Sequence, residues 1–136
     1  MIRSAISVVA AVGLSACAAS QDQPVQRSAP MGDRVIEYLG TEALLMGPDL
    51  VSIRAELRGD EVRAAVSRYV DCAVARYAVQ NGYGFARHIR TNIAKEGGVW
   101  RADAVYSITS ALPRGPHTID AEVVAQDCAA EEIPMV

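Results

Sequence analysis

Residues 50–82, LVSIRAELRGDEVRAAVSRYVDCAVARYAVQNG, hold the two clearest secondary-structure patterns in the chain. The first nine residues alternate apolar and polar side chains, which is typical of a strand with one buried face. After Asp60, apolar residues recur every three or four positions, and the pattern closes at Asn81-Gly82, where positive φ is readily adopted. We therefore predict a half-buried strand at 50–58 that leads into a long helix.

The apolar stripe of this helix predicts which side faces the core. The stripe consists of Val62, Ala65, Val66, Tyr69, Ala73 and Tyr77. Asp71 and Ala75 fall on the opposite side of the helix, which we expect to face away from the core.

Two more strands are predicted on the C-terminal side of the helix. Residues 85–93 and 99–108 flank the sequence KEGG at 95–98, which favours a hairpin turn. The sequence LPRGP at 112–116 then forms a loop, because its prolines cannot continue a strand.

The two ends of the domain carry weaker patterns. Residues 35–39 fit either a short strand or an isolated apolar anchor. Near the C-terminus, Thr118 can cap a short helix, although alternation of Ile119, Ala121 and Val123 also fits a strand. The predicted order is β-α-β-β-α, an α+β fold in which a small antiparallel sheet carries helices packed on one face.

Length and charge exclude several classes of protein. The chain has 136 residues, of which 51% are hydrophobic and 21% charged. Such a length fits one domain of about 100–150 residues, which we place at 34–136. The formal net charge is -3, so no nucleic-acid partner is expected, because binding phosphates requires a basic surface.

The N-terminus has the pattern of a bacterial lipoprotein signal. Arg3 precedes the apolar run AISVVAAVGL at 5–14, which is far shorter than the ~20 residues that a membrane-spanning helix needs. The run ends in LSAC at 14–17, which matches the lipobox, where the cysteine is acylated before cleavage in front of it. An ordinary signal peptide cut after Ala16 or Ala19 is the alternative.

We accordingly predict a lipoprotein signal peptide at 1–16, followed by a lipidated Cys17 and a flexible tether at 17–33. Two or more acyl chains anchor a protein stably to a bilayer, so the membrane is an expected partner. Ala18 and Ala19 stand where lipoproteins of the inner membrane commonly have Asp. In a Gram-negative cell this favours the outer membrane, facing the periplasm.

The other two cysteines, Cys72 and Cys128, form an even pair for an oxidising compartment. A disulfide would join the long helix to the last element, and chain-entropy estimates for such long loops are about 4 kcal/mol. Two separate buried thiols, or a reactive pair, are the alternatives. The spacing is not C-x-x-C, which argues against a redox enzyme.

The stretch 60–85, which ends in NGYGF, and the sequence DAEVVA at 120–125 resemble a group of small proteobacterial lipoproteins without assigned function. The resemblance covers most of residues 50–130. It implies an envelope location and a compact α/β domain, and it implies no catalytic residue.

No catalytic or metal-binding signature is recognised in the sequence. His88 and His117 are the only histidines, and neither has a ligand spacing, so no metal and no cofactor is expected. Glu56 and Asp103 could pair as acid and base, but carboxylates on strand surfaces usually balance nearby arginines. No serine lies in a G-x-S-x-G sequence. We therefore expect that the protein is not an enzyme.

A basic cluster is the best candidate for a binding site, and it comprises Arg54, Arg58, His88 and Arg90. These residues occupy polar positions of strands predicted to be neighbours, where guanidinium groups can fork onto carboxylate or phosphate. A solvated sheet face, with Glu56 as a counter-charge, is the alternative.

Taken together, these patterns favour an envelope-anchored lipoprotein whose domain binds a partner or has a structural role without catalysis. Another envelope protein or a glycan is the expected partner, and the oligomeric state stays open. The alternative function is a binding module for an anionic envelope ligand, a glycan carboxylate or a lipid phosphate, on the basic sheet face.

Overall fold

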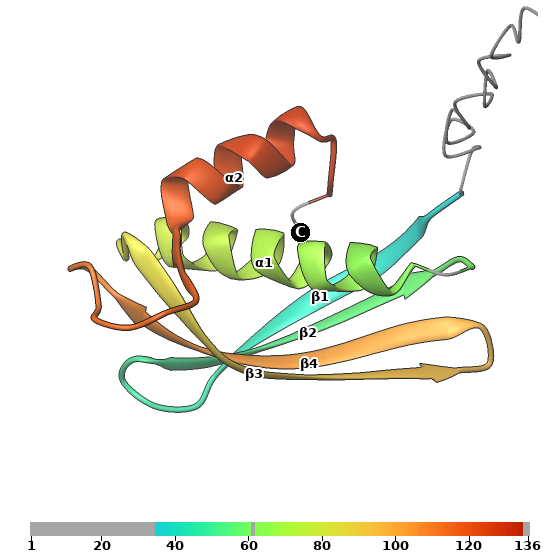
Figure 1. Ribbon diagram of the computed structural model, residues 1–136, viewed down its shortest axis with the longest axis horizontal. Coiled ribbons are helices and arrows are strands. Elements are labelled where there is room, and N and C mark those ends of the chain that lie inside the picture. Colours follow the sequence, from blue (N-terminus) through green and yellow to red (C-terminus); the bar gives the residue numbers. More distant parts are fainter. Residues whose placement is uncertain (1–34, 61, 135–136) are drawn as a thin grey trace, which may run out of the picture. The chain divides into compact units, whose positions relative to one another are not determined.

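The computed structural model describes residues 35–60 and 62–134, which form five strands and two helices (Figure 1). The predicted signal peptide, Cys17 and the tether lie outside these residues. The elements are β1 (Glu37–Leu45), β2 (Leu50–Arg58), α1 (Arg63–Gln80), β3 (Phe85–Glu96), β4 (Val99–Thr109), β5 (Thr118–Asp120) and α2 (Ala121–Ala130).

The strands form one antiparallel sheet in the order β1-β2-β4-β3-β5. The predicted α+β fold is thus confirmed, and so are the strand at 50–58 and the hairpin of β3 and β4. The hairpin turn is Gly97-Gly98, and both residues have positive φ, as tight hairpin turns favour. The predicted order lacked a full-length β1, which is an edge strand and shows no clean alternation.

The C-terminal segment combines the two readings that its sequence allowed. Thr118 does not cap a helix but opens β5, because the free edge of β3 pairs with Thr118–Asp120. The N-cap is Asp120, whose Oδ1 accepts a 3.1 Å hydrogen bond from the backbone N–H of Val123. Helix α2 follows at once.

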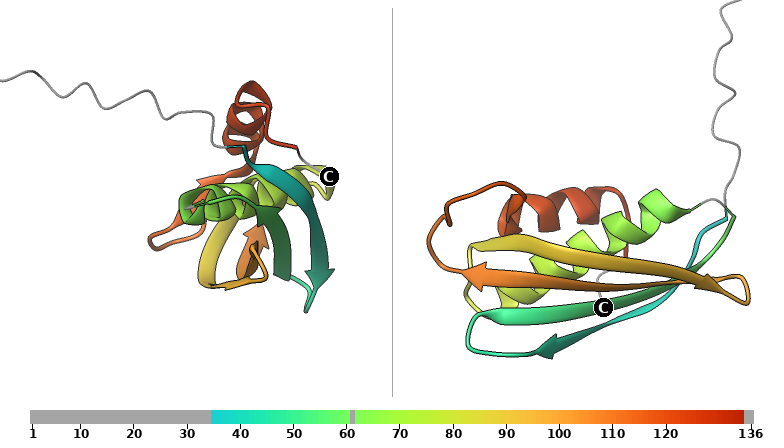
Figure 2. Two further views of the ribbon diagram at one scale, coloured as in Figure 1. Left: turned by 90° about the vertical axis from the view of Figure 1, so that its right-hand side faces the viewer. Right: turned by 60° about the horizontal axis from the view of Figure 1, so that its bottom comes forward.

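Both helices lie on the same side of the sheet (Figures 1 and 2). Helix α1 packs against the strands, and α2 packs mainly against α1. The core lies between α1 and the sheet, and its largest fully buried side chains include Tyr69, Tyr106, Ile53, Leu57 and Ile108. Within the described residues, neither helix has the length and apolar character to span a bilayer.

A disulfide joins Cys72 of α1 to Cys128 of α2, with the two Cα atoms 5.8 Å apart, as the sequence predicted. Both cysteines are fully buried, and the buried residues of α2 are Cys128 and Ala121. The disulfide thus adds a covalent attachment of α2 to α1 beside the packing of Val124 against the core.

Candidate functional site

A polar hollow of about 390 Å³ lies between α1, β3, β4 and the segment that leads into β5. Most of the residues that line it are polar, and they come from four separate parts of the chain. The lining residues are Ser67, Asp71, His88, Thr91, Tyr106, His117, Thr118 and Ile119.

An irregularity in β3 turns His88 toward this hollow. His88 is the cross-strand partner of Tyr106, whereas Arg90 is the partner of Val105, so the register shifts at Ile89. His88 and Thr91 consequently face the same side, and the His88 Nε2 and Thr91 Oγ1 atoms share a hydrogen bond of 2.6 Å. The His88 ring meets the Tyr106 ring edge to face, with centroids 5.2 Å apart.

His117 reaches the same hollow from the loop before β5. Its backbone carbonyl accepts a 2.9 Å hydrogen bond from the His88 N–H. Its φ of 61° lies in the left-handed region, which costs a non-glycine residue roughly 1–3 kcal/mol. The two histidines therefore share one site, although nothing in their sequence spacing predicted it.

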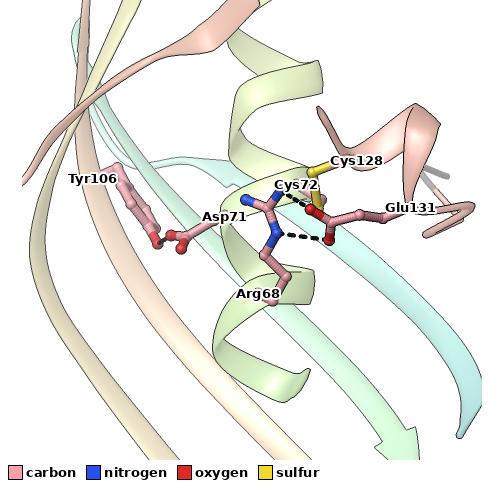
Figure 3. Close-up of a disulfide and its surroundings, with 6 residues drawn as sticks. All are labelled: Arg68, Asp71, Cys72, Tyr106, Cys128 and Glu131. Atoms are coloured by element: carbon pink, nitrogen blue, oxygen red, sulfur yellow. Dashed lines mark hydrogen bonds and ion pairs between the residues drawn. A yellow bond between two sulfur atoms is a disulfide. The ribbon is translucent and has the colours of Figure 1, made fainter. Parts of the chain in front are cut away.

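Asp71 and Tyr106 form the back of the hollow. The Tyr106 hydroxyl donates a 2.7 Å hydrogen bond to Asp71 Oδ1 (Figure 3). Burial of the ring raises the pKa of Tyr106 strongly, and the charge and hydrogen bond of Asp71 raise it further. The hydroxyl therefore stays protonated and holds the carboxylate in place.

The side chains that line the hollow supply hydrogen-bond donors and acceptors, so it can bind polar groups. No group of three His, Cys, Asp or Glu residues in 35–60 and 62–134 is placed to hold a metal ion.

The predicted basic cluster does not assemble as one patch. The sequence predicted that the strands of this cluster are neighbours, but β4 lies between β2 and β3 in the sheet. His88 lies on the face of the sheet that the helices cover. Because of the register shift in β3, Arg90 lies on the opposite face. Arg54 and Arg90 do meet, on either side of Asp103.

Carboxylates accompany all three arginines of the predicted cluster. Arg54 Nε lies 3.5 Å from Asp103 Oδ2, and Arg90 Nη1 lies 3.4 Å from Asp103 Oδ1. Arg58 pairs with Glu37 at 2.7 Å. The arginines of this sheet face are therefore paired with carboxylates, and the face also carries a smaller hollow of about 300 Å³.

The fold and the hollow define a small α+β domain with a disulfide-pinned helical layer and a polar surface site. Residues 38–132 match the model of the YNQ4 C-terminal domain, and the chain belongs to this family. It is also similar to an "Uncharacterized 26.9 kDa protein in nqo8 5'region" of Paracoccus denitrificans.

The two chains are 33% identical over 85 residues, which are 62% of this chain and 33% of the relative. The chain thus spans about a third of the length of the curated relative it matches. No solved structure matches the chain. The expected kinship with proteobacterial proteins of unknown function is confirmed at this level.

Proposed function

We propose that the chain is an envelope-anchored lipoprotein whose α+β domain binds a partner or supports envelope structure without catalysis. The observation that carries the proposal is the disulfide between Cys72 and Cys128. Structural disulfides are typical of secreted and periplasmic proteins and rare in the cytosol. With this pair bridged, the third cysteine of the chain is Cys17, which stands in the lipobox sequence LSAC.

In a Gram-negative cell the proposed location is the outer membrane, facing the periplasm, because Ala18 and Ala19 follow Cys17. The acyl chains on Cys17 then hold the domain at the membrane surface.

The polar hollow is the proposed place of contact with a partner. Its Asp71 carboxylate, hydroxyl groups and two imidazoles offer both hydrogen-bond donors and acceptors. The outer sheet face lends less support to binding, because the guanidinium groups of the predicted cluster already contact carboxylates.

Metabolic labelling with an alkyne fatty acid tests the anchor. We expect the full chain to incorporate the label and to sediment with membranes, and Cys17→Ala to lose both properties. Labelling that persists in Cys17→Ala, or a wild-type chain without label, contradicts the proposal.

Photo-crosslinking in intact cells tests the contact surface. A photoreactive residue at Ser67, which is exposed and lines the hollow, should give a discrete adduct. The matched control carries the same group at Ala64, an exposed position one turn earlier in α1 that does not line the hollow. Equal adducts from both positions, or none from a membrane-bound chain, overturn the assignment of the hollow.

A further inference from the structure

Arg87 differs from the other arginines of the described strands. Arg54, Arg58, Arg90 and Arg101 each have a carboxylate oxygen within 4.0 Å. Within the described residues, no such partner is recorded for Arg87, which lies on β3 and is half-buried. An unpaired guanidinium in this setting requires a physical explanation.

Two hydrogen-bonding atoms at this point are shielded from solvent and lack partners among the described residues. They are Arg87 Nε and Thr118 Oγ1. Arg87 and Thr118 are direct cross-strand partners in the pairing of β3 with β5, so their side chains share one face of the sheet. Arg87 Nε can only donate a hydrogen bond, and the Thr118 hydroxyl can donate one as well, so an acceptor group that reached both atoms would satisfy them.

The loop before β5 closes over the guanidinium. A Cβ atom at Gly115 would lie 3.5 Å from Arg87 Nη1, so the loop backbone passes against this group. The same loop carries Arg114, an exposed residue next to Gly115 in the sequence. Asp120, two residues beyond Thr118, already uses Oδ1 to cap α2.

We propose that Arg87, Thr118 and the loop at 112–117 form a binding site for a small oxyanion, the phosphate or carboxylate group of a ligand. The guanidinium presents its N–H groups as a planar fork that matches these anions. The proposal requires one bound oxygen to accept from both Arg87 Nε and the hydroxyl of Thr118, the cross-strand partner of Arg87. This site lies outside the predicted cluster of Arg54, Arg58, His88 and Arg90. It borders the polar hollow, whose lining includes His117 and Thr118, but the proposal depends neither on the membrane anchor nor on partner binding in the hollow.

The test is a titration of the full chain followed by NMR at the Arg87 Nε–H signal and the Thr118 amide signal. Sodium phosphate and sodium acetate are compared with sodium chloride at equal ionic strength. We expect a saturable shift with phosphate or acetate that chloride does not produce, and the two arms tell which oxyanion the site prefers. A response that follows ionic strength alone, or no response, overturns the proposal.

Variants distinguish binding at Arg87 and Thr118 from non-specific attraction of the anion to positive charge. Arg87→Gln should abolish the saturable shift of Thr118, and Thr118→Val should weaken binding about tenfold, as expected when a hydrogen bond to a charged group is lost. Arg90→Gln is the matched control, because it removes an equal charge from the same strand, and it should leave the affinity unchanged. Equal losses in Arg87→Gln and Arg90→Gln contradict the proposal. The wild-type titration decides the question even if a variant fails to fold.

Discussion

Asp71 and Cys72 are adjacent in α1, yet they attach the helix to two different elements. Asp71 accepts the hydrogen bond of Tyr106 from the sheet, whereas Cys72 is bonded to Cys128 of α2 (Figure 3). One turn of α1 is therefore tied to both the sheet and the second helix.

The ion pair of Arg68 with Glu131 reinforces the attachment to α2. Arg68 donates two hydrogen bonds, of 2.7 and 3.1 Å, to the Glu131 carboxylate, which follows α2 directly. The hydrogen bond from Arg68 lowers the pKa of Glu131. Because the carboxylate is exposed to solvent, we assign the main attachment to the disulfide.

Removal of the disulfide should destabilise the domain strongly. In Cys72→Ala/Cys128→Ala, the free energy of unfolding should fall by about 4 kcal/mol, because the unfolded chain regains the entropy of a long loop. Urea denaturation checks the size of the loss. Hydrogen exchange should show that α2 loses protection before the sheet does, and a loss below about 1 kcal/mol contradicts this account.

Tyr106→Phe should lower the free energy of unfolding by about 1–3 kcal/mol, because it leaves a partly buried carboxylate of Asp71 without its donor. Tyr83→Phe, a half-buried tyrosine with no such bond to Asp71, is the control and should change stability by less than about 0.5 kcal/mol. A double-mutant cycle with Asp71→Asn isolates the coupling between the two side chains. Equal effects of the two tyrosine substitutions count against the hydrogen bond.

Stability should fall as the pH rises above about 10, the ordinary pKa of tyrosine. Burial raises the pKa values of Tyr38, Tyr69 and Tyr106 in the folded state. The unfolded chain therefore releases these protons at lower pH than the folded chain, which favours unfolding in alkali. Urea denaturation between pH 8 and 11 measures the slope, which should be shallower in Tyr106→Phe. If the free energy of unfolding of Tyr106→Phe falls with pH as steeply as that of the wild type, the loss of stability comes from groups other than Tyr106.

His117 allows a test of backbone strain, because substitution by glycine should here give a more stable protein than substitution by alanine. At φ of 61°, glycine is favoured over any residue with a Cβ atom. We expect His117→Gly to be more stable than His117→Ala by about 1 kcal/mol, although glycine usually destabilises a folded chain. Thermal denaturation compares the stability of the two variants. Because both lack the imidazole, its loss cancels in the comparison. A more stable alanine variant shows that the loop relaxes to negative φ.

The longest elements were predictable because their own residues carry the pattern. The alternation at 50–58 and the apolar stripe after Asp60 correspond to β2 and α1. Ala75 is an exception, since it was placed on the polar side of the helix but is fully buried. Helix α1 is covered by α2 as well as by the sheet, so more of its surface is buried than a single stripe indicates.

The candidate sites were less predictable, because they depend on register and strand order. A period of two predicts that His88 and Arg90 share a face, but the register shift at Ile89 puts them on different faces. The sequence could not predict that Arg87 lacks a partner, since this depends on where every carboxylate lies after folding.

By itself, the sequence determined the α+β class, β2, α1 and the hairpin, because local periodicity and turn residues are properties of short segments. It predicted the pairing of Cys72 with Cys128 from the cysteine count, and the structure bonds the two residues. The tertiary structure decided that β4 lies between β2 and β3, that His88 and His117 share one hollow, and that Arg87 faces Thr118. These relationships join residues far apart in the chain, and only the packing of strands and helices against one another brings such residues together.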